Sequence, residues 1–115
     1  MTDNDNKPTT LLSGAIATGR GISFTITENM TFQAVLTGTT ANQNLAATIS
    51  IGVSNDGAHW IELGEIDLSV TDWDDTSEDV TDGFYAEEAA KWAYASANVS
   101  AISGTGATVS AYMGK

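Results

Sequence analysis

The chain has 115 residues and a formal net charge of −11, from 15 acidic and 4 basic residues. Because phosphate groups are bound mainly through lysine and arginine, this balance argues against nucleic acid and against an anionic membrane as partners. The sequence contains no cysteine, which excludes disulfides and thiolate chemistry, and no apolar run approaches the roughly 20 residues that span a bilayer.

Residues 1–10 are polar and charged, and they lack the positive and then apolar pattern of a signal peptide. We expect a flexible arm here and a single domain over residues 11–115. In a protein assembly such an arm can order against a neighbour, which makes Lys7 and Pro8 candidate partner contacts. The missing signal peptide and the absence of cysteine favour assembly in a cytosol.

Alternating apolar residues predict several strands in the first half of the chain. A short apolar run at 11–17 predicts an edge strand, which the Gly-Arg-Gly sequence at 19–21 ends with a turn. The alternation then predicts strands at 22–26 and 31–37, followed by a polar loop at 38–44.

The clearest local pattern lies between residues 47 and 63. Odd-numbered residues from 47 to 53 are apolar and alternate with threonine, serine and glycine. The Asn-Asp-Gly sequence at 55–57 tolerates left-handed backbone conformations, so the chain can reverse there. Together these features predict a β-hairpin.

The inward parity changes after this hairpin, from odd at Leu63 to even at Ile66. A strand keeps both sets inside only with an extra residue, so we expect a bulge or a bend at Gly64-Glu65. Such a break can let one long strand serve both sheets of a sandwich.

The second half of the chain begins with its most acidic stretch, residues 71–82, which predicts an exposed loop. The remaining expected elements are a strand at 80–86, a single helical turn at 87–91, a strand continuing to 101 and, after Gly-Thr-Gly, a last strand at 107–113. About eight short strands with hairpin connections predict an all-β fold, namely a β-sandwich, of which the jelly roll is one form.

The sequence offers little for catalysis. His59 is the only histidine and lies beside an Asp-Gly turn, and no G-x-S-x-G elbow, P-loop or dinucleotide-binding glycine pattern occurs. Paired carboxylates can hydrolyse glycosides, but fifteen acidic residues form many accidental pairs. We therefore expect His59 to be a turn residue, and we expect neither enzyme activity nor a cofactor.

Three acidic residues are candidates for a metal site. Asp72, Asp74 and Asp75 offer the oxygen ligands that calcium prefers. Their spacing does not make an EF-hand, because Ser77 and Gly83 stand where that loop needs glycine and glutamate. We expect an incidental acidic loop and keep the calcium site as the alternative.

The three tryptophans are candidates for core or for contact. We expect Trp60 and Trp92 to cover the ends of the core, whereas Trp73, flanked by acidic residues, is the best candidate for an exposed anchor. Trp60 or Trp73 is also where a sugar-stacking platform would be centred. Both are therefore candidate partner contacts.

The last 60 residues resemble small structural proteins from the head and tail gene blocks of tailed bacteriophages. The matching elements are Ser-Asn-Asp-Gly at 54–57 three residues before Trp60, Asp-Gly-Phe at 82–84, the strand from Trp92, and Ile-Ser-Gly-Thr-Gly-Ala at 102–107. Many such proteins carry an arginine where this chain reads Tyr-Ala-Ser-Ala at 94–97.

Within that group, the size and charge are most like those of capsid decoration or cement proteins. The resemblance implies a β-sandwich on the outer face of the head shell, in contact with the major capsid protein and with copies of itself as a homo-oligomer on the particle. It would be assembled in the cytoplasm of the bacterial host. The alternatives are a carbohydrate- or receptor-binding module of a tail or fibre, and a tail-tube or connector component.

Overall fold

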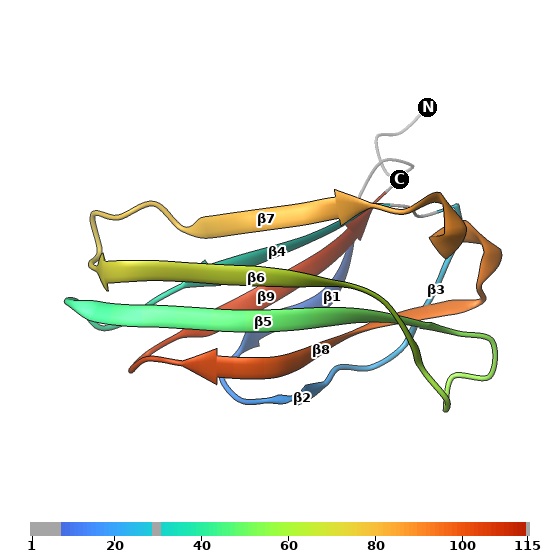
Figure 1. The fold of residues 1–115 in the computed structure, drawn as a ribbon, viewed down its shortest axis with the longest axis horizontal. Coiled ribbons are helices and arrows are strands. Elements are labelled where there is room, and N and C mark those ends of the chain that lie inside the picture. The colour runs from blue at the N-terminus through green and yellow to red at the C-terminus, as the bar shows by residue number, and fades with distance from the viewer. Residues whose placement is uncertain (1–7, 29–30, 115) are drawn as a thin grey trace.

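The computed structural model describes residues 8–28 and 31–114, and within them the chain forms an all-β sandwich (Figure 1). Two antiparallel sheets pack face to face, which confirms the predicted fold class. A single-turn 3₁₀ helix, η2 (Glu87–Lys91), is found where a helical turn was expected. The described strands are β1 (Thr9–Ala15), β2 (Gly19–Arg20), β3 (Phe24–Thr25), β4 (Thr31–Thr37), β5 (Gln43–Ser54), β6 (Ile61–Trp73), β7 (Val80–Tyr85), β8 (Tyr94–Ser103) and β9 (Thr108–Gly114).

The chain crosses between the two sheets several times, and only β2–β3 and β5–β6 are consecutive strands of the same sheet. The first sheet, called sheet A, has the order β1-β9-β4-β7, and the second, called sheet B, has the order β2-β8-β5-β6. β3 pairs with the same edge of β8 as β2 does, but nearer to the start of β8. Within the described residues, no helix has the length and apolar character needed to cross a membrane.

The core lies between the inner faces of the sheets. Phe32 and Leu36 of β4 face Ile49 and Ile51 of β5, and each of these side chains is almost completely buried. Alanines at 34, 95, 97 and 111 are fully buried as well, and their small size lets the two sheets approach closely. The period of two therefore sorts apolar residues inward and polar residues outward in both sheets.

The hairpin is present as β5 and β6, joined by a loop at 55–60. The predicted break in parity is also present, one position before the expected one. The register shifts between Ile51, opposite Gly64, and Gly52, opposite Glu62, so Leu63 is the extra residue of a bulge. β6 nevertheless pairs only with β5 and stays in sheet B.

The segment between β1 and β4 differs from the prediction. Only Phe24–Thr25 of the expected strand at 22–26 is regular, and Ile22 is 72% exposed. The expected turn at Gly19-Arg20 forms β2 instead, because it lies against the edge of β8. The remaining residues of this segment are held by two isolated main-chain hydrogen bonds. Gly21 N donates to Ala97 O in β8, and Ile26 N donates to Ala93 O just before β8.

Two predicted boundaries also move. β6 runs on to Trp73, so the exposed acidic loop is confined to residues 74–79 rather than 71–82. β1 begins at Thr9, so Thr9 and Thr10 belong to the sandwich and not to the arm. Pro8 is exposed, and Lys7 lies outside the described residues.

Candidate functional site

A polar cluster built on Arg20 lies on the outer face of sheet B. Arg20 in β2 pairs with Asn98 in β8, so its side chain points away from the core, as does that of Ser96. Its Nη1 donates a hydrogen bond to Ser96 Oγ at 2.7 Å. Its Cζ lies 5.1 Å from the ring centroid of Trp60, which is cation–π geometry. The guanidinium is therefore held on two sides.

Gly52 makes room for this cluster in the central strand of sheet B. A Cβ atom at this position would lie 2.9 Å from Arg20 Nη1 and 3.5 Å from Trp60 Cβ. Gly52 and Ser96 are cross-strand partners, and both are buried although they belong to the outer face. The arginine and the tryptophan thus lie across strands β5 and β8.

Arg20 has no carboxylate partner in the described part of the chain. The one ion pair there joins His59 and Asp56. A guanidinium carries five N–H donors in a planar fork, and Ser96 uses one of them. The remaining donors suit a carboxylate or phosphate supplied by another molecule.

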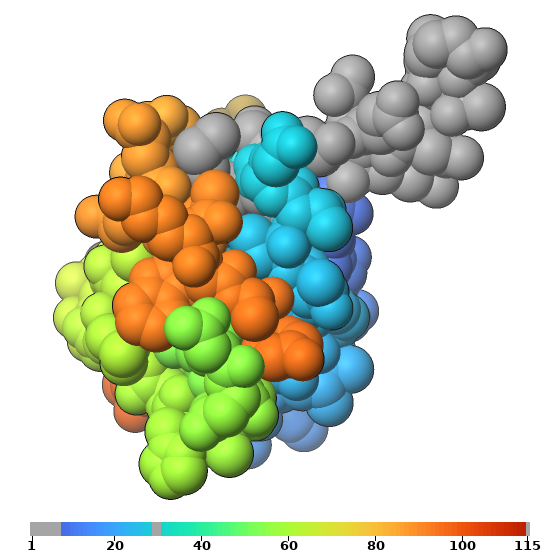
Figure 2. Space-filling view, turned by 90° about the vertical axis from the view of Figure 1, so that its right-hand side faces the viewer, coloured from blue at the N-terminus to red at the C-terminus, as the bar shows by residue number. Residues whose placement is uncertain are grey.

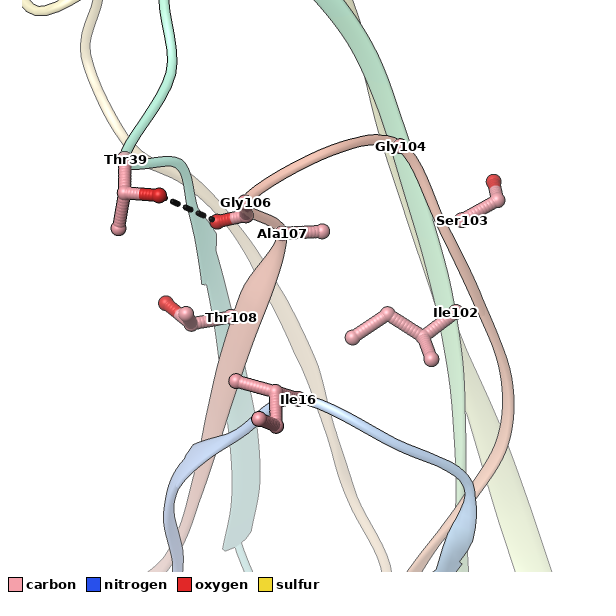
Figure 3. Close-up of a pocket in the computed structure, with 8 residues that line it drawn as sticks. All are labelled: Ile16, Thr39, Ile102, Ser103, Gly104, Gly106, Ala107 and Thr108. Atoms are coloured by element: carbon pink, nitrogen blue, oxygen red, sulfur yellow. Dashed lines mark hydrogen bonds between the residues drawn. The ribbon is translucent and has the colours of Figure 1, made fainter.

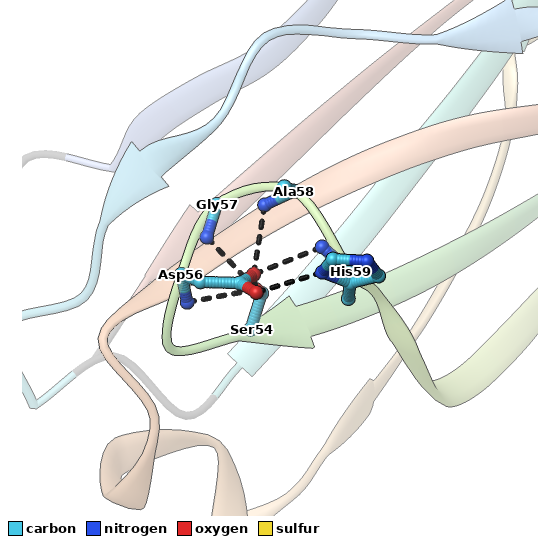
Figure 4. Close-up of polar contacts among 5 residues, drawn as sticks. All are labelled: Ser54, Asp56, Gly57, Ala58 and His59. Carbon is cyan, nitrogen blue, oxygen red and sulfur yellow. Dashed lines mark hydrogen bonds and ion pairs between the residues drawn. The ribbon is translucent and has the colours of Figure 1, made fainter.

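The loop that carries Trp60 is ordered by Asp56 (Figure 4). Asp56 Oδ1 accepts hydrogen bonds from Ala58 N and His59 N, both at 2.9 Å, and from Ser54 Oγ at 2.8 Å. Ser54 Oγ in turn accepts a bond from Gly57 N at 2.9 Å, where φ is +74°. The donors from His59 and Ala58 lower the pKa of Asp56 well below its ordinary value.

His59 is a turn residue, as predicted. Its side chain is 91% exposed, and its Nδ1 lies 2.8 Å from Asp56 Oδ2. Serine, histidine and aspartate meet in this loop, but Ser54 bonds to Asp56 and not to His59. The loop therefore lacks the contact between base and hydroxyl on which a catalytic triad depends.

This loop lies at one end of the sandwich. Figure 2 looks onto that end, where the loop (green) lies against the segment around η2 (orange) and beside the segment that follows β2, residues 21–28 (blue to cyan). Asn55 Oδ1 accepts a hydrogen bond from Ala93 N at 3.0 Å, which ties the loop to the start of β8. The loop that carries Trp60 is thus held both by its internal hydrogen bonds and by this contact with the start of β8.

The prediction that Trp73 is an exposed anchor is wrong. Its side chain is only 6% exposed and closes the end of the core against Leu45 and Gly38. The cause lies in the backbone: Asp72 has a φ of +53°, and the register shifts between the Gln43 and Leu45 pairings, which returns Trp73 to the inner face. Flanking acids therefore gave a misleading signal.

The other two tryptophans also differ from the expectation in part. Trp60 is half-buried on the outer face of sheet B rather than at an end of the core. Trp92 is half-buried and packs against the core, as predicted. Arg20 was missed because two glycines flank it in an apparent turn; the usable signal was that it is the one arginine in the sequence.

The three candidate calcium ligands are not brought together. In the described residues, no group of three or more histidine or acidic side chains could hold a metal ion. Asp74 Oδ1 instead accepts hydrogen bonds from the Thr76 hydroxyl at 2.6 Å and Thr76 N at 2.9 Å, which lower the pKa of Asp74. These contacts make Asp74 part of the turn between β6 and β7.

A shallow pocket of about 380 Å³ lies where the β8–β9 turn meets the connection between β1 and β2 (Figure 3). Thr39 Oγ1 donates a hydrogen bond to Gly106 O across its rim at 3.4 Å. The lining consists of uncharged residues: Ile16, Thr39, Ile102, Ser103, Gly104, Gly106, Ala107 and Thr108. It therefore holds no acid, base or charged anchor.

Comparison with known proteins does not extend this description. No protein-family model, curated protein or solved structure matches the chain. The fold and the Arg20–Trp60 cluster are therefore what any functional argument has to use.

Proposed function

We propose that this protein is a decoration, or cement, protein of a tailed-bacteriophage capsid. It would bind the outer face of the head shell, bridge neighbouring subunits of the major capsid protein, and so stabilise the particle after assembly in the bacterial cytoplasm. The resemblance of its last 60 residues to phage structural proteins raised this function, and the strand order supports it.

The strand order is the observation that carries the proposal. If β2 and β3 are counted as one interrupted strand on β8, eight strands divide into β1-β9-β4-β7 and β2/β3-β8-β5-β6. We infer that this sandwich is a jelly roll, in which each sheet interleaves early and late strands. Jelly rolls recur in viral capsid proteins and in lectins.

The outer face of sheet B is the proposed capsid-binding surface. It presents Arg20 on Trp60, together with three acidic side chains along the edge strand β6: Glu62, Glu65 and Asp67. Arginine and tryptophan are enriched among residues that dominate protein interfaces. The acidic row favours a partner whose surface is basic, and many copies on one particle make weak individual contacts sufficient.

The alternative function is a carbohydrate- or receptor-binding module, because lectins also use jelly rolls. A sugar-stacking platform needs an open aromatic face. Trp73 is buried, Trp92 packs against the core, and Arg20 covers Trp60. These contacts favour the capsid over a glycan as the partner. A tail-tube or connector component would instead form rings or tubes in isolation.

The test is binding to capsids of the native source prepared without this protein. We expect the purified protein to co-sediment with them at many copies per particle, and electron microscopy to place it on the outer shell. Arg20→Ala and Trp60→Ala should each weaken binding by about tenfold or more, since interface anchors contribute upwards of ~1 kcal/mol. Lys91→Ala, which removes an exposed cation from η2, is the matched control and should bind normally.

Two results would overturn the proposal. The first is the absence of any binding to such capsids by a folded protein. The second is glycan binding that Trp60→Ala abolishes while capsid binding stays negligible, which would establish the alternative.

A further inference from the structure

In the described strands, the outer face of sheet A carries no charged side chain. Phe32, Ala34 and Leu36 of β4 are buried, so Gln33 and Val35 between them point away from the core. Cross-strand pairing extends this face to the neighbouring strands, because paired residues share one side of a sheet. We call its central residues panel A: Gln33, Val35, Thr81, Tyr85, Ser110 and Tyr112.

Panel A contrasts with the rest of a strongly acidic protein. The four strands of sheet A contain one charged residue, Asp82. It pairs with buried Ala34, so it belongs to the other side of the sheet and not to panel A. The outer face of sheet B, by comparison, carries acidic residues along β6 and the cation Arg20. One broad side of the slab is therefore neutral and the other is charged.

We propose that two copies of this chain pair through panel A, sheet A against sheet A. The net charge of −11 makes any approach of two copies repulsive unless carboxylates are kept apart. Panel A is a broad face that contains no carboxylate, so two copies can approach through it. Tyrosine-containing surfaces without lysine, aspartate or glutamate are also the composition found at the centre of protein interfaces. The proposal does not depend on the capsid function.

The geometry favours a two-fold pair with Gln33 near the axis. β4 and β9 are the inner strands of sheet A, and Gln33 and Tyr112 are outward-facing cross-strand partners one position from the midpoint of each strand. Gln33 is held in place by a bond from its Nε2 to Thr81 Oγ1 at 2.9 Å. In a two-fold interface, residues close to the axis meet their own copies.

The size of the face predicts a weak dimer. Four strands about 4.8 Å apart, each spanning about 20–23 Å, give a face of about 380–440 Å² per copy. A standard stable interface buries about 800 Å² per partner. We therefore expect dissociation constants on the order of 100 μM, which matter at high local concentration.

A charge swap at Gln33 tests this pairing. The wild-type protein is examined from about 5 μM to 1 mM by sedimentation velocity, with an amide NMR dilution series to locate the contact. We expect reversible dimerisation, with dilution shifts confined to sheet A. Gln33→Glu and Gln33→Lys should each weaken it at least tenfold, because like charges then meet at the axis. An equimolar mixture of the two variants should recover dimerisation.

The matched control is Ser69→Asp, which adds one negative charge to the outer face of sheet B and should leave dimerisation within about twofold of wild type. Circular dichroism checks that every variant is folded. A wild-type protein that stays monomeric throughout overturns the proposal, even if Gln33→Glu weakens capsid binding. A dimer that Ser69→Asp disrupts and both Gln33 variants spare also overturns it. Capsid binding is measured separately, so failure of one proposal is distinguishable from failure of the other.

Discussion

Asp56 illustrates how one side chain orders a six-residue loop. Its two carboxylate oxygens accept bonds from two backbone amides, one hydroxyl and one imidazole. Every one of these contacts favours the ionised form, which is why the pKa of Asp56 is lowered although the residue is exposed. The loop is therefore tied to the charge of a single group.

A pH dependence follows from the lowered pKa. Because the folded-state pKa of Asp56 lies below its unfolded value of about 3.8, its contribution to stability is complete above that value and is lost as the pH falls. We expect the melting temperature to fall less steeply between about pH 5 and pH 2 in Asp56→Asn than in wild type. Asp74, whose pKa is also lowered, accounts for part of the slope that remains.

The contrast in this test is supplied by Asp56→Ala. Asparagine can still accept the bonds from Ala58 N and His59 N, whereas alanine cannot. Asp56→Ala should lower the melting temperature by a few degrees at neutral pH. Identical acid profiles for wild type and Asp56→Asn would contradict the role assigned to this carboxylate.

Trp73 is where the sequence pattern misled most. Neighbouring acids predicted exposure, but one residue with positive φ, Asp72, changes the parity and brings the indole inside. That conformation depends on the bond from Asp72 N to Asn44 Oδ1, 28 positions away in the chain. No local pattern of residues 71–75 contains this information.

Substitution at Trp73 should therefore act on stability. Trp73→Ala should cost about 3–5 kcal/mol of unfolding free energy, since a large buried side chain is lost. Trp73→Phe should cost less than half of this. Nε1 of Trp73 is buried without a hydrogen-bond partner in the described structure, so its removal leaves no buried acceptor unpaired. Urea unfolding measures both. Full stability of Trp73→Ala would mean that the side chain is not part of the core.

Elements with long internal patterns were predictable, and those defined by distant pairing were not. The β5–β6 hairpin and its bulge follow from the apolar alternation and from the change of inward parity, both of which lie within residues 47–70. β2 and β3 have two residues each and exist only because β8, about 70 to 80 positions later, offers an edge. The Arg20–Trp60 cluster was hidden for the same reason, because β2, β5 and β8 assemble it.

The contact between β6 and β7 can be tested through Gly64. Gly64 lies on the inner face of sheet B, and an added Cβ would approach Cζ of Phe84 in sheet A to 2.9 Å. We expect Gly64→Ala to cost about 1–3 kcal/mol, as other overpacked cores do. Phe84→Leu, combined with it, should recover part of the loss despite removing the Phe84–Phe32 ring contact. Strictly additive effects in this double-mutant cycle would show that the two positions do not touch.

At the scale of the whole molecule, the net charge of −11 opposes compaction. Raising sodium chloride from about 20 to 300 mM should therefore raise the melting temperature, since salt screens repulsion between exposed carboxylates. The rise should be smaller in Glu62→Gln/Glu65→Gln, which thins the acidic row on β6. A melting temperature that does not respond to salt would contradict this view of the surface.

The pairing of β1 with β9 has one more consequence. Thr9 and Met113 are opposite each other, so the first and last strands begin and finish at the same corner of the sandwich (Figure 1). A linker of a few glycines and serines should close the backbone into a loop there, and new termini opened between β6 and β7 should leave both hydrogen-bonded sheets intact. Such a circular permutant would carry a fused cargo from the opposite end of the domain without altering either broad face.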